Sequence, residues 1–367
     1  MKPATSVSAE LSIHNRVQLR LSDKEQILIK TMKKKLFIYM VCLTSVSLTS
    51  CTRHDGDGIV VSAPFGPLVY PLVSMVERSY PSSFPGSIEL SIWNNPDQLR
   101  AMIAGRQADF FAVPTNVAAL FYNRGVDVKL INVSVWGVLW VVSSDSTKKE
   151  LRDFGGEEIV MPFKGDMPHI VFNTLVRKRG LNPEKDFIMH FVSTPQDAVQ
   201  QLIMGHAHHA VLAEPDVSIL LYKSRLLRTD GEQSTIFYRA IDLQKEWGSV
   251  YHTGDGIPIG GIAIHASTAA QPEVVAMFQR EYAKAVEWCT THPEETAALV
   301  AHHFEDIPTE PIVESMKHVN QKCVTAWTAR KALEDFFSVL YDGNPASIGD
   351  TIPGDGFYWQ DEPAQSP

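Results

Sequence analysis

The chain has 367 residues, of which 44% are hydrophobic and 20% are charged, an ordinary composition for a globular protein. A chain of this length exceeds what one hydrophobic core usually organises, so we expect two domains or lobes. The formal net charge of −9 argues against binding of nucleic acid, which relies on neutralising phosphates.

A basic and then apolar segment, "KKKLFIYMVCLTSVSLTSC", occupies Lys33 to Cys51. Its apolar run from Leu36 to Leu48 has 13 residues, whereas a membrane-spanning helix needs about 20. A basic flank, a short apolar run and small residues after it are typical of a secretory signal. A core helix that happens to end in cysteine is the alternative, but three adjacent lysines fit it poorly.

The ending "LTSC" resembles a bacterial lipobox, in which the cysteine is lipidated and the preceding peptide is removed. We therefore expect residues 1–51 to be an N-terminal extension plus a lipoprotein signal peptide, with Met32 as a plausible true start. Cys51 would then carry a lipid anchor on a bacterial membrane, and the protein would work in the periplasm or at the cell surface.

The first folded elements repeat one pattern of strand, loop and helix. The pattern occurs in "IVVSAPFGPLVYPLVSMVE", in "SIELSIWNNPDQLRAMIAGRQ" and in "ADFFAVPTNVAALFYNRG". Strands that alternate with helices predict a parallel α/β sheet, with ligand-facing loops at the carboxyl ends of the strands.

The run from Val128 to Asp145 is long enough for two successive strands, the second of which leads out of the first lobe. A second series of strands and helices follows, and Gly256 to Thr268 reads as an extended return to the first lobe. The expected boundaries are 58–142 for the first part of lobe 1, 143–258 for lobe 2, 259–343 for the return to lobe 1 with C-terminal helices, and 344–367 for a tail that is loose at its end.

The ordered set "GRQADFFAVPTNVA", "KGDMPHIVFNTLVRKRGLNPEKDF" and "AVQQLIMGHAHHAVLAEP", with the lipobox in front, resembles a known family. This family is the extracytoplasmic solute-binding proteins of ABC importers, in the nitrate, sulfonate, taurine and thiamine-pyrimidine-precursor group. The resemblance covers roughly residues 58 to 340. It implies an α/β periplasmic-binding-protein type II clamshell with a ligand cleft between two lobes.

The resemblance also implies a function without catalysis or a cofactor. The expected role is capture of a small organic solute, like a sulfonate, nitrate or a thiamine precursor, and its delivery to an ABC permease with its ATPase. The expected protein is a monomer. Where sulfonate and nitrate binders tend to carry small hydroxyl residues, this chain has Lys164, Asp166 and Met167, which argues against a sulfonate or inorganic anion as the ligand.

In such a clamshell, ligand contacts come from loops at the carboxyl ends of strands in both lobes. Several of these residues also have a purely structural interpretation, as core packing for the aromatic side chains and as helix caps for the polar ones. The candidates of the first lobe are Phe65, Gly66, Trp93, Asn94, Thr115 and Asn116.

The second lobe contributes a predicted strand-to-helix turn whose N–H groups favour an acceptor. Asp166 could instead cap its own helix, and Glu214 could accept hydrogen bonds from an amine or amidine, which would favour a nitrogen-rich ring or a cation as ligand. The candidates of this lobe are Gly165, Asp166, His169, Ser193, Thr194 and Glu214.

The two connections between the predicted lobes contain small residues that can absorb backbone rotation. The hinge candidates are Trp136 and Gly137 on the outward connection, and Pro258 and Gly260 on the return. Trp136 or Trp140 could also stack on an aromatic ligand, although core packing is the more frequent fate of such residues.

Two groups of residues could carry other chemistry. Cys289 and Cys323 could form one disulfide or remain two buried thiols, and the sequence leaves both open. His206, His208 and His209 resemble a metal cluster, but no carboxylate or cysteine stands at ligand spacing, so we predict no metal site.

An enzyme is the rival class. Fungal pyrimidine synthases resemble this fold but use a cysteine-rich segment that this chain lacks, and the chain has no G-x-S-x-G, P-loop or H-E-x-x-H motif. A lipid-anchored sensor or metal-binding lipoprotein is the third possibility.

Overall fold

The computed structural model describes residues 58–78, 87–229, 235–254, 256–304 and 307–360. The chain divides into Met1–Gly56 and Asp57–Pro367, and all described residues belong to the second unit. The expected signal peptide and the lipidation site Cys51 lie outside the described residues.

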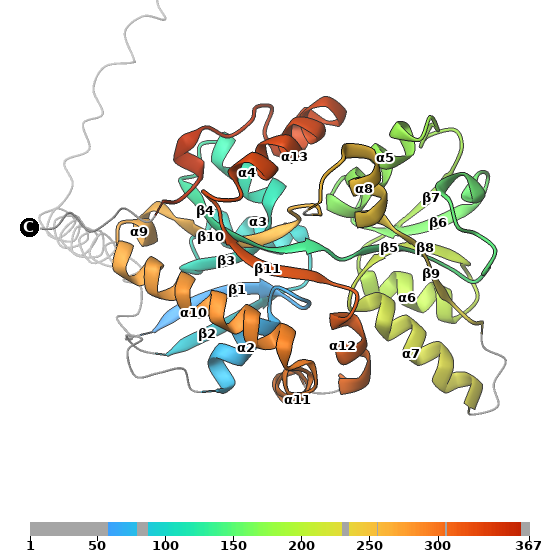
Figure 1. Ribbon diagram of the computed structural model, residues 1–367, viewed down its shortest axis with the longest axis horizontal. Coiled ribbons are helices and arrows are strands. Elements are labelled where there is room, and N and C mark those ends of the chain that lie inside the picture. Colours follow the sequence, from blue (N-terminus) through green and yellow to red (C-terminus); the bar gives the residue numbers. More distant parts are fainter. Residues whose placement is uncertain (1–57, 79–86, 230–234, 255, 305–306, 361–367) are drawn as a thin grey trace, which may run out of the picture. The chain divides into compact units, whose positions relative to one another are not determined.

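The first lobe is built on a sheet with the strand order β11-β4-β10-β3-β1-β2 (Figure 1). Strands β1, β2 and β3 are parallel, while β10 runs antiparallel to β3 and β4, and β11 antiparallel to β4. The strands are β1 Ile59–Pro64, β2 Ile88–Trp93, β3 Phe110–Pro114, β4 Val128–Gly137, β10 Gly260–His265 and β11 Asn320–Thr325.

The second lobe has the order β7-β6-β8-β5-β9, which matches β2-β1-β3-β10-β4 of the first sheet and has no counterpart of β11. Strands β6, β7 and β8 are parallel, and β5 runs antiparallel to β8 and β9, as β10 does to its neighbours in the first sheet. The strands are β5 Leu139–Ser143, β6 Glu158–Pro162, β7 Ile188–Val192, β8 His209–Ala213 and β9 Tyr238–Asp242.

The chain crosses between the lobes at two places. It leaves the first sheet at the end of β4, and β5 already pairs with the second sheet, so this crossover falls at Val138 rather than at the expected boundary between residues 142 and 143. The difference arises because β5 completes the second sheet beside β8. The return passes from α8 (Leu243–Tyr251) through Pro258 into β10.

Helices cover both sheets (Figure 1). The second lobe carries α5 Met167–Lys178, α6 Pro195–Ile203, α7 Asp216–Thr229 and α8 Leu243–Tyr251. The first lobe carries α2 Tyr70–Glu77, α3 Pro96–Ala104, α4 Thr115–Asn123, α9 Ala266–Ala269, α10 Pro272–Thr291, α11 Pro293–His303, α12 Thr309–Met316 and α13 Arg330–Gly343. No helix among the described ranges is both long and apolar enough to cross a membrane.

Local sequence explains where several of these helices begin. Asn95 caps α3, because its side chain accepts a hydrogen bond from the backbone N–H of Gln98, and Pro96 occupies the first turn. Thr194 and Asp197 form a reciprocal capping box at the start of α6. These caps fix the helix ends that follow β2 and β7, and they thereby position the loops between the lobes.

The core of the first lobe extends to the C-terminal segment. The rings of Phe110 and Phe278 stack with centroids 3.8 Å apart. Phe357 and Trp359 are buried, and the backbone N–H of Trp359 donates to the carbonyl of Leu130 at 2.9 Å. The expected tail therefore packs onto this lobe as far as the described residues reach, through the short helices η2 Pro345–Ile348 and η3 Asp355–Phe357.

The two cysteines whose state the sequence left open are free thiols. Cys289 is buried on α10 and Cys323 is partly buried on β11. Burial raises the pKa of the Cys289 thiol to about 11 and that of Cys323 to about 12. Thiols of this kind are protonated at neutral pH and are poor nucleophiles.

Candidate functional site

A cavity of about 530 Å³ lies between the two lobes. Its lining includes residues at or just after the carboxyl ends of β1 and β2 in the first sheet, and residues in the first turns of the helices that follow β7 and β8 in the second. Ligand sites of open α/β sheets form at such carboxyl ends. The lining residues are Phe65, Ile92, Asn94, Phe304 and Ile307 from the first lobe, and Gln196, Val199, Gln200, Ile203, Met204, Asp216, Ile219 and Lys223 from the second.

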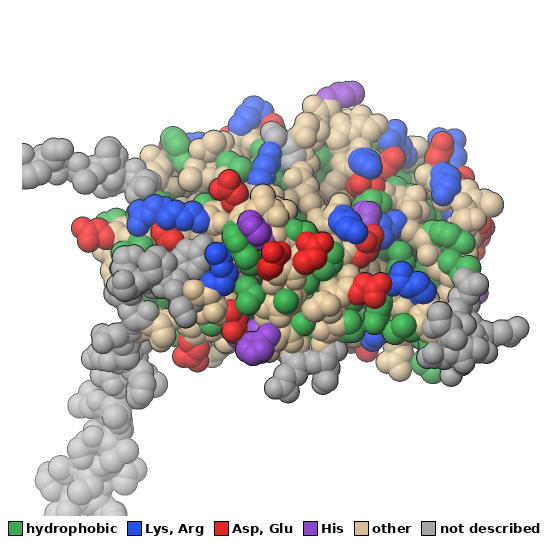
Figure 2. Space-filling model, turned by 60° about the horizontal axis from the view of Figure 1, so that its bottom comes forward, with side chains coloured by type: hydrophobic (Ala, Val, Ile, Leu, Met, Phe, Trp, Pro, Cys, Tyr) green, Lys and Arg blue, Asp and Glu red, His purple; other side chains and the backbone are tan. Residues whose placement is uncertain are grey.

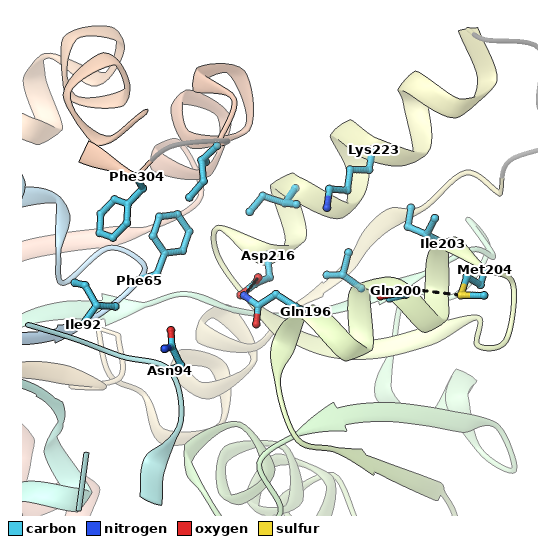
Figure 3. A pocket seen from close by; sticks show the side chains of 13 residues that line it. Phe65, Ile92, Asn94, Gln196, Gln200, Ile203, Met204, Asp216, Lys223 and Phe304 are labelled. Atoms are coloured by element: carbon cyan, nitrogen blue, oxygen red, sulfur yellow. Dashed lines mark hydrogen bonds between the residues drawn. The ribbon is translucent and has the colours of Figure 1, made fainter. Parts of the chain in front are cut away.

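The walls of this cavity are mostly apolar. Phe65, in the loop after β1, meets Phe304 edge to face with ring centroids 5.3 Å apart, and the aliphatic side chains of α6 and α7 face them across the space (Figure 3). A cavity of this size, with apolar walls and few polar groups, is typical of a site for a small organic molecule.

Asp216 is the only carboxyl among the described residues that line the cavity. It stands at the start of α7 and is 8% exposed. The amide of Gln196 donates to its Oδ1 over a long 3.4 Å. Burial, and then the charge of Glu214, raises the pKa of this carboxyl to about 7, and Lys223 opposes the rise. Asp216 is thus poised to change its protonation near neutral pH.

Glu214, two residues before Asp216, is fully engaged inside the second lobe. Its Oε1 accepts from Arg239 Nε at 2.9 Å and from Nη2 at 2.7 Å. Its Oε2 accepts from the hydroxyl of Ser218 at 2.8 Å and from the backbone N–H of the same residue at 3.1 Å. Both carboxylate oxygens of Glu214 are therefore occupied by these bonds, so neither is free to bind a ligand amine as we expected. Asp216, in contrast, lines the cavity.

Two of the first-lobe candidates, Phe65 and Asn94, line the cavity. Gly66 lies against Pro215 of the second lobe, with a φ of +139° that disfavours other residues. Trp93 is buried, and its indole N–H lacks a hydrogen-bond partner among the described atoms.

The candidates Thr115 and Asn116 at the start of α4 are buried and bonded within the first lobe. Thr115 donates its hydroxyl to the carbonyl of Pro258 at 2.6 Å, which ties α4 to the returning connection. The amide of Asn116 donates to the carbonyl of Ser347. These bonds give both residues a structural role, and neither lines the cavity.

The turn of Gly165, Asp166 and His169 lies at the entrance to α5, outside the cavity lining. Asp166 is the N-cap residue but makes no capping bond; its Oδ1 instead accepts from Arg100 of the first lobe at 2.9 Å. The backbone N–H of Gly165 donates to Nδ1 of His169 at 3.1 Å. Burial, with the positive charges of Lys164 and Arg177, lowers the pKa of this histidine, so it is neutral at pH 7.

The pair Ser193 and Thr194 also lies at a helix start, that of α6. Thr194 caps this helix through its hydroxyl, which accepts from the N–H of Asp197 at 3.1 Å, and Ser193 is exposed. Neither residue lines the cavity, and Gln196, in the first turn of the same helix, reaches it instead.

The hinge candidates lie at the two crossovers. Trp136 is buried and donates its indole N–H to the carbonyl of Lys322 at 3.0 Å. The side chain of Gln244 binds both the N–H and the carbonyl of Leu139, at 2.7 and 3.0 Å. A Cβ on Gly137 would overlap the Cγ of Gln244, so a glycine is needed there for close approach.

The return connection is packed as tightly. Pro258 accepts the bond from Thr115, and Gly260 lies against the side chain of Leu68. Whether the four hinge candidates absorb a rotation stays a prediction.

Ion pairs also connect the lobes outside the cavity. Arg100 of α3 binds Asp166 across the interface, and Arg225 of α7 binds Glu310 of α12. α12 packs along α7, and both ion pairs join the two lobes in this conformation.

Sequence reasoning missed most of the cavity wall. The residues from α6 and α7, together with Phe304 and Ile307 of the first lobe, are ordinary apolar or polar positions of amphipathic segments. The one indication in the sequence of this part of the site was the "AEPD" stretch, from which we selected Glu214 and which also contains Asp216.

The histidine segment that resembled a metal cluster is bonded within the second lobe. His209 is buried on β8, with its Nδ1 3.0 Å from the hydroxyl of Ser143, and His208 is exposed. No group of three or more potential metal ligands occurs within the described ranges of the chain.

The comparisons with known proteins agree on the fold. An ABC transporter from Parabacteroides distasonis shares 20% identity, with a TM-score of 0.67 over 83% of this chain and 99% of that one. The periplasmic aliphatic sulphonate-binding protein SsuA from Escherichia coli shares 17% identity, with a TM-score of 0.61 over 83% of this chain and 93% of that one. The periplasmic nitrate-binding protein NrtA from Synechocystis shares 14% identity, with a TM-score of 0.57 over 80% of this chain and 81% of that one.

These structures confirm the two-lobed clamshell and the resemblance to binding proteins of ABC importers at the level of the fold. No curated protein matches the chain. A family model described as menaquinone biosynthesis matches residues 67–342, which the sequence reasoning did not foresee. The match spans both lobes and most of the chain, so this protein belongs to the menaquinone biosynthesis family and has the fold of the ABC-importer binding proteins.

Proposed function

We propose that this protein is the substrate-binding component of an ABC importer, which captures a small organic solute between its lobes and delivers it to a membrane permease with its ATPase. The cavity carries this proposal, because strand ends of both sheets contribute its walls and a bound molecule would touch both lobes at once. Such a ligand favours the closed arrangement of the lobes over the open one.

The surroundings of the cavity support capture of an organic molecule rather than of a bare anion. Nitrate would face apolar walls and the carboxyl of Asp216, with Lys223 as the one cation among the described lining residues. A sulfonate or a thiamine precursor would need its organic part to fill the space. Figure 2 shows acidic and basic side chains interspersed on the face in view, a surface without the basic field that anion steering uses.

Lipid anchoring belongs to the same proposal. Lipidation of Cys51 would hold a monomer at a bacterial membrane, in the periplasm or at the cell surface, beside its permease. The likeness in fold to the sulphonate-binding and nitrate-binding proteins supports this role, and the lipobox-like "LTSC" supports the anchor.

The test is calorimetric titration of the full chain, with Cys51→Ser to keep it free of lipid, against thiamine precursors, sulfonates, nitrate, amines and amino acids. One organic class should bind, and Phe65→Ala should weaken its binding at least about tenfold, since the ring is a wall of the cavity. Tyr341→Ala removes an exposed aromatic from α13 and should leave the affinity unchanged. Failure of every class to bind, or binding indifferent to Phe65→Ala, contradicts capture in this cavity.

A second candidate function is an enzyme. Membership of the menaquinone biosynthesis family favours it, and so does Asp216, a carboxyl inside the cavity with a pKa of about 7, which suits a general acid or base. Mass spectrometry of a ligand incubated with the protein separates the two functions. A binding protein releases the compound unchanged, whereas an enzyme converts it, and Asp216→Asn would slow that conversion.

A further inference from the structure

The described lining of the cavity between the lobes contains one carboxyl, Asp216, among mostly apolar side chains. This combination indicates which chemical class of ligand the cavity would bind. Asp216 and Gln196 point into the middle of the space, between the ring of Phe65 on one side and α6 and α7 on the other (Figure 3). Since Glu214 is bonded to Arg239 and Ser218, Asp216 is the acid that remains for a ligand.

We infer that the solute is an organic amine, with an apolar body between Phe65, Phe304 and Ile219 and a protonated nitrogen on the carboxylate of Asp216. This inference rests on the proposed function and names the ligand class of its site. In this inference Asp216, rather than Glu214 as the sequence suggested, is the residue that binds the ligand nitrogen.

The bonding around Asp216 leaves room for such a nitrogen. Its side-chain hydrogen bond within the described part of the chain comes from Gln196 at 3.4 Å, which is longer than the usual range for an N–H donor. Lys223 and a backbone hydrogen bond lower the pKa of this carboxyl, but burial outweighs them and the pKa is still raised to about 7, so the buried carboxylate remains costly. A ligand ammonium would add a short charge-assisted hydrogen bond and a further positive charge.

The charged neighbours of Asp216 are consistent with a cation arriving from the cavity. Lys223 lies two turns further along α7, and its side chain is exposed. Its amine points from α7 into the same cavity (Figure 3), and its positive charge lowers the pKa of Asp216. Glu214 adds negative charge, and Tyr70 of α2 is neutral, because burial raises its pKa far above the usual range. Burial and Glu214 together outweigh Lys223, since the pKa of Asp216 is raised, and a positive group on the ligand would offset them.

The apolar part of the cavity selects the rest of the molecule. Phe65 and Phe304 come from the first lobe, and Ile219 and Val199 come from the second. A ring or chain that fills about 530 Å³ of space would contact both lobes while its nitrogen stays on Asp216. A small amine without an apolar body, or an inorganic ion, would leave these apolar side chains in contact with water and would gain little from them.

The test compares three probes with one body and different ends: phenylbutylamine, phenylbutanol and phenylbutyrate. Each is titrated calorimetrically into the full chain carrying Cys51→Ser, at pH 8, where Asp216 is ionised and the amine is protonated. The amine should bind at least about tenfold more tightly than the alcohol, because a hydrogen bond to a charged group is worth roughly ten- to hundredfold in affinity. The carboxylate should bind least.

The matched variants locate the contact. Asp216→Asn keeps the size of the side chain and should weaken the amine at least about tenfold while leaving the alcohol within about twofold. Asp335→Asn is the control, because Asp335 lines a separate cavity beside Tyr251, and it should change neither probe.

Each other outcome overturns a stated part of the account. If phenylbutyrate binds most tightly and Lys223→Met abolishes its binding, the ligand is an acid, so the amine assignment fails while solute capture stands. If the amine binds equally well to Asp216→Asn, the assignment of Asp216 fails. If none of the three probes binds although another organic compound binds in a Phe65-dependent way, the amine class fails alone; if no compound binds at all, the proposed function fails with it.

Discussion

The ion pair between Glu214 and Arg239 offers the sharpest test of how the second lobe is stabilised. The Glu214 side chain is fully buried and that of Arg239 is 12% exposed, and both also bond Ser218. Arg239→Met would leave the carboxylate uncompensated. Breaking a buried pair by removing one partner costs roughly 3–5 kcal/mol, so we expect a loss of about 3 kcal/mol and a melting temperature lower by about 6 °C.

Urea unfolding followed by circular dichroism measures this loss. Arg225→Met is the matched control, because its pair with Glu310 is more than half exposed on both sides, and surface pairs contribute about 0–1 kcal/mol. Adding Glu214→Gln to Arg239→Met should recover at least about 1 kcal/mol, since it removes the unpaired charge. A loss in Arg239→Met no larger than that in Arg225→Met would refute the reasoning.

Three further variants test the cavity, the packing at the hinge candidate Gly137 and a helix cap. Because the folded-state pKa of Asp216, about 7, lies above the unfolded value of roughly 3.9, this group stabilises the fold fully below pH 4 and loses that contribution as pH rises through 7. Urea unfolding should show Asp216→Asn more stable than the parent at pH 8, by on the order of a few kcal/mol, and equal to it at pH 4; equal differences at both pH values would contradict this. Gly137→Ala should cost about 1–3 kcal/mol by driving a methyl group into Gln244, and Gln244→Ala in the same chain should reduce that cost in the same assay; additive losses would show that the two side chains do not meet. Thr194→Ala should lower the free energy of unfolding by about 1 kcal/mol, because it removes the cap of α6, and it should leave the calorimetric affinity for a solute unchanged. A large loss of affinity without a loss of stability would instead show that Thr194 contacts the ligand.

Local pattern predicted the elements of the fold well. Apolar runs such as "IVVSAP" became strands, and "NNPDQL" became a cap followed by a helix, because caps, turns and periodicity act over a few residues. The run from Val128 to Asp145 divided into β4 and β5 as expected. The position of the crossover within it depended on which sheet β5 would join, which is a long-range choice that local pattern does not contain.

The site was predictable only where it coincides with strand ends. Phe65 and Asn94 follow β1 and β2 and line the cavity, as the topology of an α/β sheet requires. The roles of Glu214 and Asp216 could not be separated from sequence, since the difference lies in Arg239, which reaches Glu214 from β9, 25 residues away. The apolar walls from α6 and α7 depend on how the lobes close over each other, and no local signal marks them.

Hydrogen exchange of the full chain, with and without a saturating solute identified by titration, tests the central claim most directly. Capture between the lobes predicts slower exchange in the loops after β1 and β2 of the first lobe together with the first turns of α6 and α7 of the second, because these segments form opposite walls of one cavity. Protection confined to one lobe, or centred on the cavity beside Tyr251 and Asp335, would contradict it.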